Sequence, residues 1–114
     1  VMRKITRLAV RAFNNNQPIK QDNTEIRVID CGKYKRIQMR LHNNVIAEKT
    51  PNGLFVCSCG WRSITTKERL NGLSGVHVVQ RNYDWYLNGK YWTGVRVNVR
   101  EWDEDGPTDV IFTT

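Results

Sequence analysis

Apolar residues recur every three to four positions near the start of the chain, which is the spacing of one face of a helix. The spacing predicts a helix over residues 3–14 whose buried face consists of Ile5, Leu8, Ala9, Ala12 and Phe13. Its opposite face carries three basic side chains that stand one turn apart: Arg3, Arg7 and Arg11. We expect the helix to end in the segment 14–18, because its asparagines tolerate a left-handed conformation and its proline cannot continue a helix.

From Thr24 onward apolar and polar residues alternate, as they do in strands with one buried face. The alternation predicts strands over residues 24–30, 35–42, 45–49 and 54–59, joined as an antiparallel meander. One face of the second strand is apolar, and its other face reads Arg36, Gln38, Arg40 and His42. Asn43 and Asn44 are predicted to form a tight turn, and residues 51–53 to form the next one, because these residue types suit turns.

The second half of the chain predicts one more helix and one more hairpin. Thr65 and Glu68 have the spacing of a capping box and predict a short helix that ends near Asn71. A strand is expected over residues 76–81. The Asn-Gly pair at 88–89 is the strongest hairpin signal in the chain, and it would place Tyr86 opposite Tyr91 and Trp85 opposite Trp92.

Alternating valines predict a further strand over residues 95–100, whose polar positions are Arg96, Asn98 and Arg100. Residues 110–113 are expected to add a short edge strand. The sequence therefore predicts an α+β fold: a twisted, mainly antiparallel sheet of hairpins, packed by an N-terminal helix and a short second helix. The expected core joins the apolar helix positions Ile5, Leu8, Ala12 and Phe13 to the strand positions Ile26, Val28, Ile37, Met39, Leu41, Phe55 and Val78.

Charge divides the 114 residues into two parts. Residues 1–100 carry 18 Lys and Arg against 6 Asp and Glu, whereas residues 101–114 carry 5 acidic residues and no basic one. We therefore predict a single basic domain over residues 2–100, followed by an acidic tail over 101–114. A basic domain favours polyanions such as nucleic acid, because neutralised phosphates release their counterions. The tail would dock on that domain or compete for its partner.

The length of the apolar runs and the number of cysteines bear on the cellular compartment and on membrane contact. No apolar run reaches the length that spans a bilayer, and the three cysteines are too few for a disulfide framework. These features predict a cytoplasmic protein with no membrane partner.

The candidate binding residues are arginines on three elements, each with an apolar face to bury and a basic face left in water. Arginine holds phosphate with a planar fork of donors, so these side chains are the expected nucleic-acid contacts: Arg3, Arg7, Arg11, Arg36, Arg40, Arg96 and Arg100. Tyr34 and Trp92 are candidates for stacking on bases. The alternative is that each basic face is a solvated surface and each ring belongs to the core.

Metal and catalytic chemistry find little support in the residue pattern. Cys57 and Cys59 form one close pair, and Cys31, His42 and His77 stand alone, whereas structural zinc needs two close ligand pairs. We expect the paired thiols to be small core groups on one strand face. The chain has no glycine-rich phosphate loop and no nucleophile elbow. We therefore expect no enzyme activity, no metal and no cofactor.

Several motifs carry a family resemblance, namely Gly60-Trp61 with the run Thr65-Thr66-Lys67-Glu68-Arg69-Leu70-Asn71, and Trp85-Tyr86-Leu87-Asn88-Gly89-Lys90. On these motifs the chain resembles a family of small proteins from tailed bacteriophages. The resemblance covers most of residues 2–92. It implies a phage protein that acts in the infected host, and it implies no particular chemistry.

Charge and resemblance together favour non-enzymatic binding of nucleic acid, with DNA preferred to RNA. The alternative is a module that binds and inhibits a host protein through the aromatic hairpin around Trp85 and Trp92, whose rings would form an apolar patch. A virion or assembly component is a third class. Self-association into a homo-oligomer is compatible with each of them.

Overall fold

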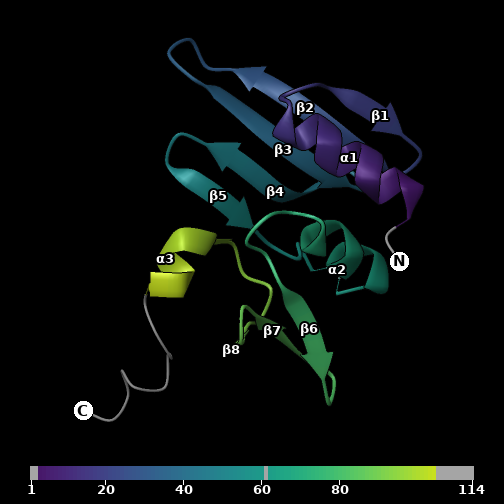
Figure 1. The fold of residues 1–114 in the computed structure, drawn as a ribbon, viewed down its shortest axis with the longest axis vertical. Coiled ribbons are helices and arrows are strands. Elements are labelled where there is room, and N and C mark those ends of the chain that lie inside the picture. The colour runs from purple at the N-terminus through teal and green to yellow at the C-terminus, as the bar shows by residue number, and fades with distance from the viewer. Residues whose placement is uncertain (1–2, 61, 105–114) are drawn as a thin grey trace.

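The structure is a computed structural model that describes residues 3–60 and 62–104. Within these residues, three helices and nine strands follow one another (Figure 1). The helices are α1 (Lys4–Asn14), α2 (Ile64–Asn71) and α3 (Val99–Glu104). The strands are β1 (Ile19–Gln21), β2 (Thr24–Asp30), β3 (Lys35–Leu41), β4 (Asn44–Thr50), β5 (Gly53–Val56), β6 (Val78–Arg81), β7 (Asp84–Leu87), β8 (Lys90–Tyr91) and β9 (Val97–Asn98). The predicted α+β class is confirmed.

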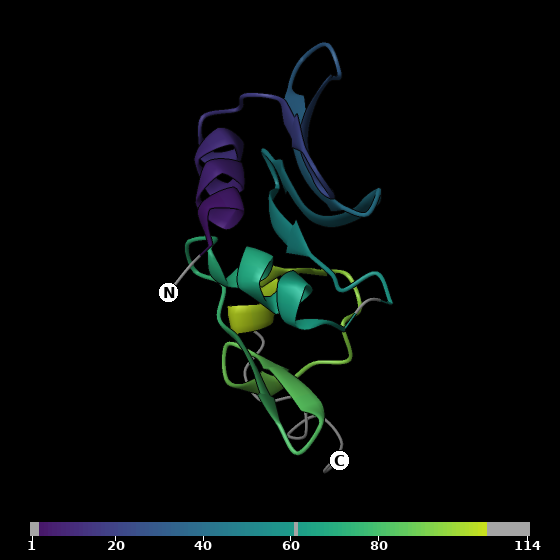
Figure 2. The ribbon, with the colours of Figure 1, turned by 90° about the vertical axis from the view of Figure 1, so that its right-hand side faces the viewer.

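The larger sheet is an antiparallel meander closed by a late strand. Its order is β1-β2-β3-β4-β5-β9, so the chain returns after about forty residues to pair β9 with β5. Helix α1 lies on one face of this sheet, and the other face carries no helix in the described part of the chain (Figure 2). Strands β6, β7 and β8 form a second, smaller sheet.

The core lies between α1 and the sheet, where the predicted alternation holds. Ile26, Ile37, Met39 and Leu41 are buried on the helix side, and so are Ala12 and Phe13 of α1; Ala9 and Val78 are buried as well.

Three core predictions need correction. Ile5 and Leu8 are only half-buried, because the buried line of α1 runs through Thr6, Ala9, Ala12 and Phe13. Phe55 pairs with Glu48, and Glu48 pairs with Gln38, which alternates with the buried residues of β3. Phe55 therefore lies on the face of the sheet opposite α1.

The turn between β3 and β4 lies one residue earlier than predicted. His42 and Asn43 occupy it with φ values of 52° and 68°, and Leu41 pairs with Asn44. This register keeps Leu41 on the buried face beside its other partner, Thr24, and a shift of one residue would turn it to solvent. The pairing is interrupted by a bulge between Met39 and Arg40.

The N-terminus of α2 also differs from the prediction. Ser63, not Thr65, is the N-cap residue, and its Oγ accepts a hydrogen bond from the Thr66 amide at 3.1 Å. Glu68 therefore does not fold back onto the helix amides as a capping box requires. Its carboxylate instead accepts hydrogen bonds from Thr6 at 2.6 Å and from Arg3 at 2.8 Å, both outside α2.

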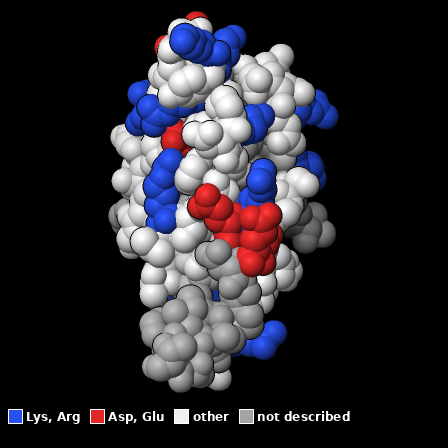
Figure 3. Space-filling model, turned by 90° about the vertical axis from the view of Figure 1, so that its left-hand side faces the viewer, with Lys and Arg blue, Asp and Glu red and all other residues white. Residues whose placement is uncertain are grey.

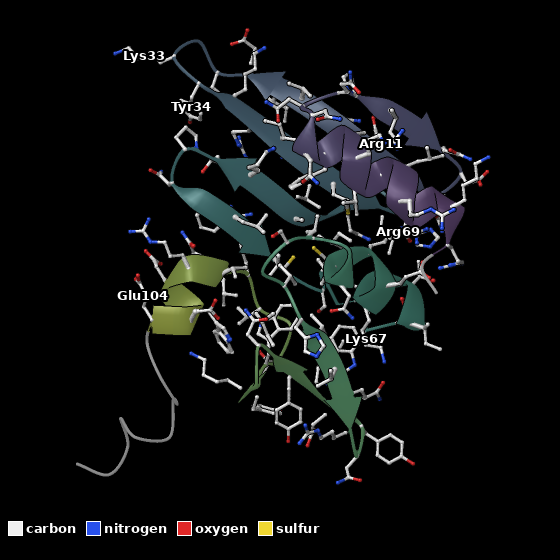
Figure 4. All side chains as sticks on the ribbon, viewed as in Figure 1. Arg11, Lys33, Tyr34, Lys67, Arg69 and Glu104 are labelled. Atoms are coloured by element: carbon white, nitrogen blue, oxygen red, sulfur yellow. The ribbon has the colours of Figure 1, made fainter. Side chains whose placement is uncertain are left out.

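The guanidinium of Arg69 is buried where α1, α2 and β2 meet. The residue is 1% exposed, and Figure 4 shows it between the two helices. Its Nη1 donates to Thr6 of α1 at 2.5 Å and to the Glu68 carboxylate at 2.7 Å, and its Nε donates to Thr24 of β2 at 3.2 Å. A buried charge is tolerated only when it is paired and hydrogen-bonded in this way. One side chain thus connects three elements.

The second hairpin has the predicted turn and register. Asn88 and Gly89 occupy the turn between β7 and β8, and Tyr86 pairs with Tyr91. Trp85 and Trp92 face each other across the hairpin with ring centroids 6.3 Å apart. Both indoles are buried, and the Trp92 indole N–H donates to the Val95 carbonyl at 2.8 Å.

The strand predicted over residues 95–100 is confirmed at Val97 and Asn98 and is wrong at the other positions. Only Val97 and Asn98 are extended, and α3 begins at Val99. The Asn98 side chain accepts a hydrogen bond from the Arg100 amide at 3.1 Å, which satisfies a donor that the first turn of a helix leaves free. Helix α3 continues past residue 100, and Trp102 donates to the Leu87 carbonyl of β7 at 2.8 Å. Residues 110–113, predicted as an edge strand, lie outside the described residues.

We expect Arg69→Ala to lower the free energy of unfolding by roughly 3 kcal/mol, because it removes packing and leaves buried hydroxyls without their donor. Arg69→Lys should be intermediate, since an ammonium cannot reach Thr6 and Thr24 with a fork. Urea unfolding of both variants measures the effect. Arg11→Ala, on the exposed side of α1, is the matched control and should change stability by less than about 0.5 kcal/mol. Equal losses in Arg69→Ala and Arg11→Ala would contradict the role of Arg69.

Candidate nucleic-acid interface

The face of the larger sheet opposite α1 gathers basic side chains from distant parts of the chain. Because Ile37, Met39 and Leu41 of β3 point to the core, the alternate residues Arg36, Gln38 and Arg40 point to the other face. Arg96 joins them from the residue before β9, next to the β5–β9 pairing. We call Arg36, Gln38, Arg40, Glu48 and Arg96 the arginine face.

Glu48 organises the arginine face. Its side chain is 2% exposed, and its two carboxylate oxygens accept from three neighbours. Arg36 donates through Nε at 2.9 Å and Nη2 at 2.7 Å, and the Gln38 amide donates at 2.8 Å, all to the same oxygen. Arg96 donates to the other oxygen at 2.9 Å. The carboxylate thus holds two guanidiniums that are 60 residues apart in sequence.

Two further contacts fix the arginines. Gln38 links Arg40 to the network, because its Oε1 accepts hydrogen bonds from Arg40 Nε at 3.1 Å and Nη2 at 2.9 Å. The Arg96 guanidinium lies over the Phe55 ring, 4.5 Å from its centroid, which is the geometry of a cation–π contact. The arginine side chains remain accessible, with 40% of Arg36 and 50% of Arg96 exposed. The face therefore presents held guanidiniums to solvent.

The electrostatics of Glu48 reflect these partners. Burial by itself raises the pKa of the Glu48 carboxyl, but hydrogen bonds from Gln38, Arg96 and Arg36 outweigh burial, so its pKa lies below the ordinary value. The hydrogen bond to Glu48 and the charge of that carboxylate raise the pKa of Arg36. With Glu48 ionised, three guanidiniums and one carboxylate leave the arginine face with a formal charge of +2.

Acidic residues lie beside the basic surface. Figure 3 shows basic side chains spread over the upper part of one side of the molecule and an acidic group below them. The acidic side chains of α3 are Glu101, Asp103 and Glu104, and all three are exposed. On β2, the Arg27 guanidinium is paired with Glu25 at 3.3 Å on the face that also carries Arg36 and Arg40. On this face of the sheet, the surplus of positive charge therefore lies on β3 and at Arg96.

The other predicted arginines lie elsewhere. Arg3, Arg7 and Arg11 belong to the α1 region, on the opposite side of the sheet, and Arg3 is paired with Glu68 at 2.8 Å. Arg100 is on α3 and faces Glu104 at 3.7 Å. The structure therefore brings together Arg36, Arg40 and Arg96, and it separates them from the α1 arginines and from Arg100.

The two stacking candidates differ in accessibility. Tyr34 is 45% exposed and precedes β3, two residues before Arg36, and Figure 4 shows it near the β2–β3 turn. Trp92 is 1% exposed and packs on Trp85, which is equally buried. Trp92 is therefore corrected from a stacking residue to a core residue. The same burial removes Trp85 and Trp92 as the exposed patch of a protein-binding hairpin.

Sequence reasoning missed Glu48 as part of the site. Its strand was predicted, and Glu48 is the only acidic residue between Asp30 and Glu68, which is a signal that a basic sheet holds one buried counter-charge. The cysteines also differ from the prediction. Strand β5 ends at Val56, so Cys57 and Cys59 lie in the following loop, where Cys57 is half-buried and Cys59 is exposed.

A metal ion needs clustered ligands, and a membrane span needs a long apolar helix. Within residues 3–60 and 62–104, no three His, Cys, Asp or Glu side chains gather closely enough to hold a metal ion. Among the helices of the same residues, none has the length and apolar composition needed to cross a bilayer.

Comparison with known proteins places the chain in a family. A family model described as "Kyanoviridae Gp96 protein" matches residues 2–109. The chain belongs to this phage protein family. The match confirms the resemblance to tailed-phage proteins, and it spans the whole described fold, including the arginine face. Comparisons with curated proteins and with solved structures gave no match.

We expect Glu48→Gln to reduce stability by about 2 kcal/mol at neutral pH, because it removes the charge to which two guanidiniums donate. The pKa of Glu48 is lowered on folding, so its contribution is complete above the ordinary value of 4.5 and is lost as the pH falls through the lower folded value. Unfolding free energies measured between pH 7 and pH 2 should therefore converge for wild type and Glu48→Gln at the acidic end. A constant difference across the whole range would contradict this assignment.

Proposed function

We propose that this phage protein binds nucleic acid without catalysing a reaction, that it prefers DNA, and that the arginine face is the binding surface. The observation that carries the proposal is the network around Glu48, which holds Arg36 and Arg96 on one carboxylate while 40% and 50% of their side chains, respectively, stay exposed. Guanidiniums fixed before binding lose less conformational entropy when they contact phosphate.

The composition of the face supports an anionic ligand. Stability alone requires only that the Glu48 charge is neutralised, yet the face holds three guanidiniums. Phosphates supply the negative charge that the remaining guanidiniums lack, and each contact releases counterions. The exposed ring of Tyr34, close in sequence to Arg36, offers a stacking surface at one end of the face.

The α1 arginines enter the proposal differently from the sequence prediction. Arg3 is engaged with Glu68, and α1 covers the other face of the sheet. A ligand seated on the arginine face therefore does not contact Arg11, which makes this residue a matched control for Arg40. Both are arginines on regular elements, and they lie on opposite sides of one sheet.

The salt dependence of binding tests the proposal. For three phosphate contacts, a plot of the logarithm of the association constant against the logarithm of salt concentration should have a slope of about −3 for duplex DNA and about −2 for a single strand. Arg40→Ala should weaken binding roughly tenfold at 0.1 M salt and reduce the slope by about one unit. Arg40 is the best residue to change because it does not contact Glu48 directly, so Arg36 and Arg96 keep their contacts with that carboxylate.

The matched control and the alternative ligands complete the experiment. Arg11→Ala should bind as tightly as wild type, and fluorescence anisotropy with labelled duplex DNA, single-stranded DNA and RNA of one sequence compares the ligands. Equal weakening by Arg40→Ala and Arg11→Ala would show that binding does not use the arginine face. An affinity that does not change with salt concentration would overturn the nucleic-acid proposal. Binding to RNA alone would overturn the preference for DNA.

A further inference from the structure

The loop after β5 holds two thiols in direct contact. The Sγ atoms of Cys57 and Cys59 are 2.7 Å apart, and both lie against the Val45 carbonyl, at 3.2 Å and 2.8 Å. In a regular strand, residues two apart are separated by about 7 Å. Here Cys59 has a φ of 53° and Gly60 a φ of 80°, so the chain curls and brings the two side chains together.

Backbone contacts hold this arrangement in place. The Cys57 amide donates to the Ile46 carbonyl of β4, and the Ser58 amide donates to the Gly94 carbonyl, both at 2.9 Å. Gly94 has a φ of 94°, and a Cβ at this position would lie 2.2 Å from the Ser58 Oγ. The loop is therefore anchored at Cys57 and Ser58, while Cys59 as a whole residue lies at the surface.

The surroundings of the thiols are basic. A hollow in the surface is lined by Cys57 and Cys59 together with Arg62 and Arg96. The charge of Arg96 favours the thiolate form of Cys59, although burial and the hydrogen bond with Cys57 dominate and raise the pKa of Cys59 to about 12. A small anionic molecule that reacts with thiols would therefore be attracted to this hollow.

We propose that Cys57 and Cys59 form a thiol–disulfide exchange site for anionic low-molecular-weight disulfides of the glutathione class. The Cys57 thiolate attacks one sulfur of the oxidised ligand, the ligand's S–S bond breaks, and one ligand thiolate leaves. Cys59 then loses its proton to the leaving thiolate or to water and attacks the Cys57 sulfur. The second ligand thiolate leaves, two protein thiols have become one disulfide, and the ligand disulfide has been reduced to two thiols.

Cys57 is assigned the first attack for two reasons. The backbone amide of Cys57 donates to the Ile46 carbonyl of β4, which holds this residue in place, and burial and the hydrogen bond with Cys57 disfavour the thiolate form of Cys59. The thiol site shares Arg96 with the arginine face, but backbone contacts hold the two thiols whether or not the arginine face binds a phosphate.

The experiment uses the full chain with Cys31→Ser, so that only the two loop cysteines remain. The protein is equilibrated in buffers with different ratios of reduced and oxidised glutathione, and the free thiols are alkylated and counted by mass spectrometry. Both thiols should be lost together as the ratio becomes oxidising, and a dithiol reductant should restore both. Retention of both thiols at every ratio, or disulfide-linked dimers only, would overturn the proposal.

Single substitutions of the pair provide the matched variants. In Cys31→Ser combined with Cys59→Ser, Cys57 has no partner and should accumulate as a mixed disulfide with glutathione. In Cys31→Ser combined with Cys57→Ser, the mixed disulfide on Cys59 should form more slowly. Circular dichroism verifies that each variant is folded. Equal rates in the two variants would contradict the assignment of the first attack to Cys57.

The charge of the oxidant tests the role of the hollow. Oxidised glutathione is anionic and cystamine is cationic, so oxidised glutathione should react faster at low salt, and the difference should shrink as salt rises. Arg62→Ala, which changes a residue of the hollow outside the Glu48 network, should reduce the preference. A faster reaction with cystamine at low salt would contradict the anionic ligand class.

Discussion

The buried guanidinium of Arg69 is the interaction on which the arrangement of the helices depends. It lies where α1, α2 and β2 meet, and it donates to the hydroxyls of Thr6 and Thr24 and to the Glu68 carboxylate. Removing a charge from water costs several kcal/mol unless its donors are satisfied. The three elements must therefore hold their acceptors at fixed positions, which constrains how α1 and α2 pack against β2. An apolar contact of equal area would not impose such fixed positions.

The Glu48 network has the opposite charge arrangement. At Arg69 a buried cation is surrounded by acceptors, whereas at Glu48 a buried anion is surrounded by donors that reach into solvent. The first network joins elements within the fold, and Arg3, which donates to the same Glu68 carboxylate, is its solvent-exposed guanidinium. The second is more open, because Arg36, Arg40 and Arg96 have donors left over after Glu48 and Gln38 are satisfied. Among charged networks of the described residues, the more open one is therefore the candidate for an outside ligand.

The sequence predicted what depends on neighbouring residues. The limits of β2, the body of α1 and the Asn88–Gly89 turn follow from local periodicity and turn chemistry, and all three agree with the structure. The prediction was wrong where a distant contact decides between local options. Glu68 fits a capping box by spacing, but Thr6 and Arg3, more than 60 residues away, hold its carboxylate. Val99 continues an alternating pattern, but the Asn98 side chain caps a helix there.

The same difference between local patterns and distant contacts determines how much of the candidate site could be predicted. Alternation in β3 placed Arg36 and Arg40 on one face, but it could not show that Arg96 meets them on Glu48 or that α1 covers the opposite face. Charge counting treated all seven arginines as equal. The fold separates them by partner and by burial: Glu104 pairs with Arg100, Glu68 is shared by Arg3 and the buried Arg69, and Glu48 is shared by Arg36 and Arg96, which both reach solvent. A one-to-one pair leaves no net charge for a ligand, while a carboxylate shared by two solvent-exposed guanidiniums leaves an accessible surplus. The surplus, more than the number of basic residues, determines where a polyanion gains most from contact with this surface.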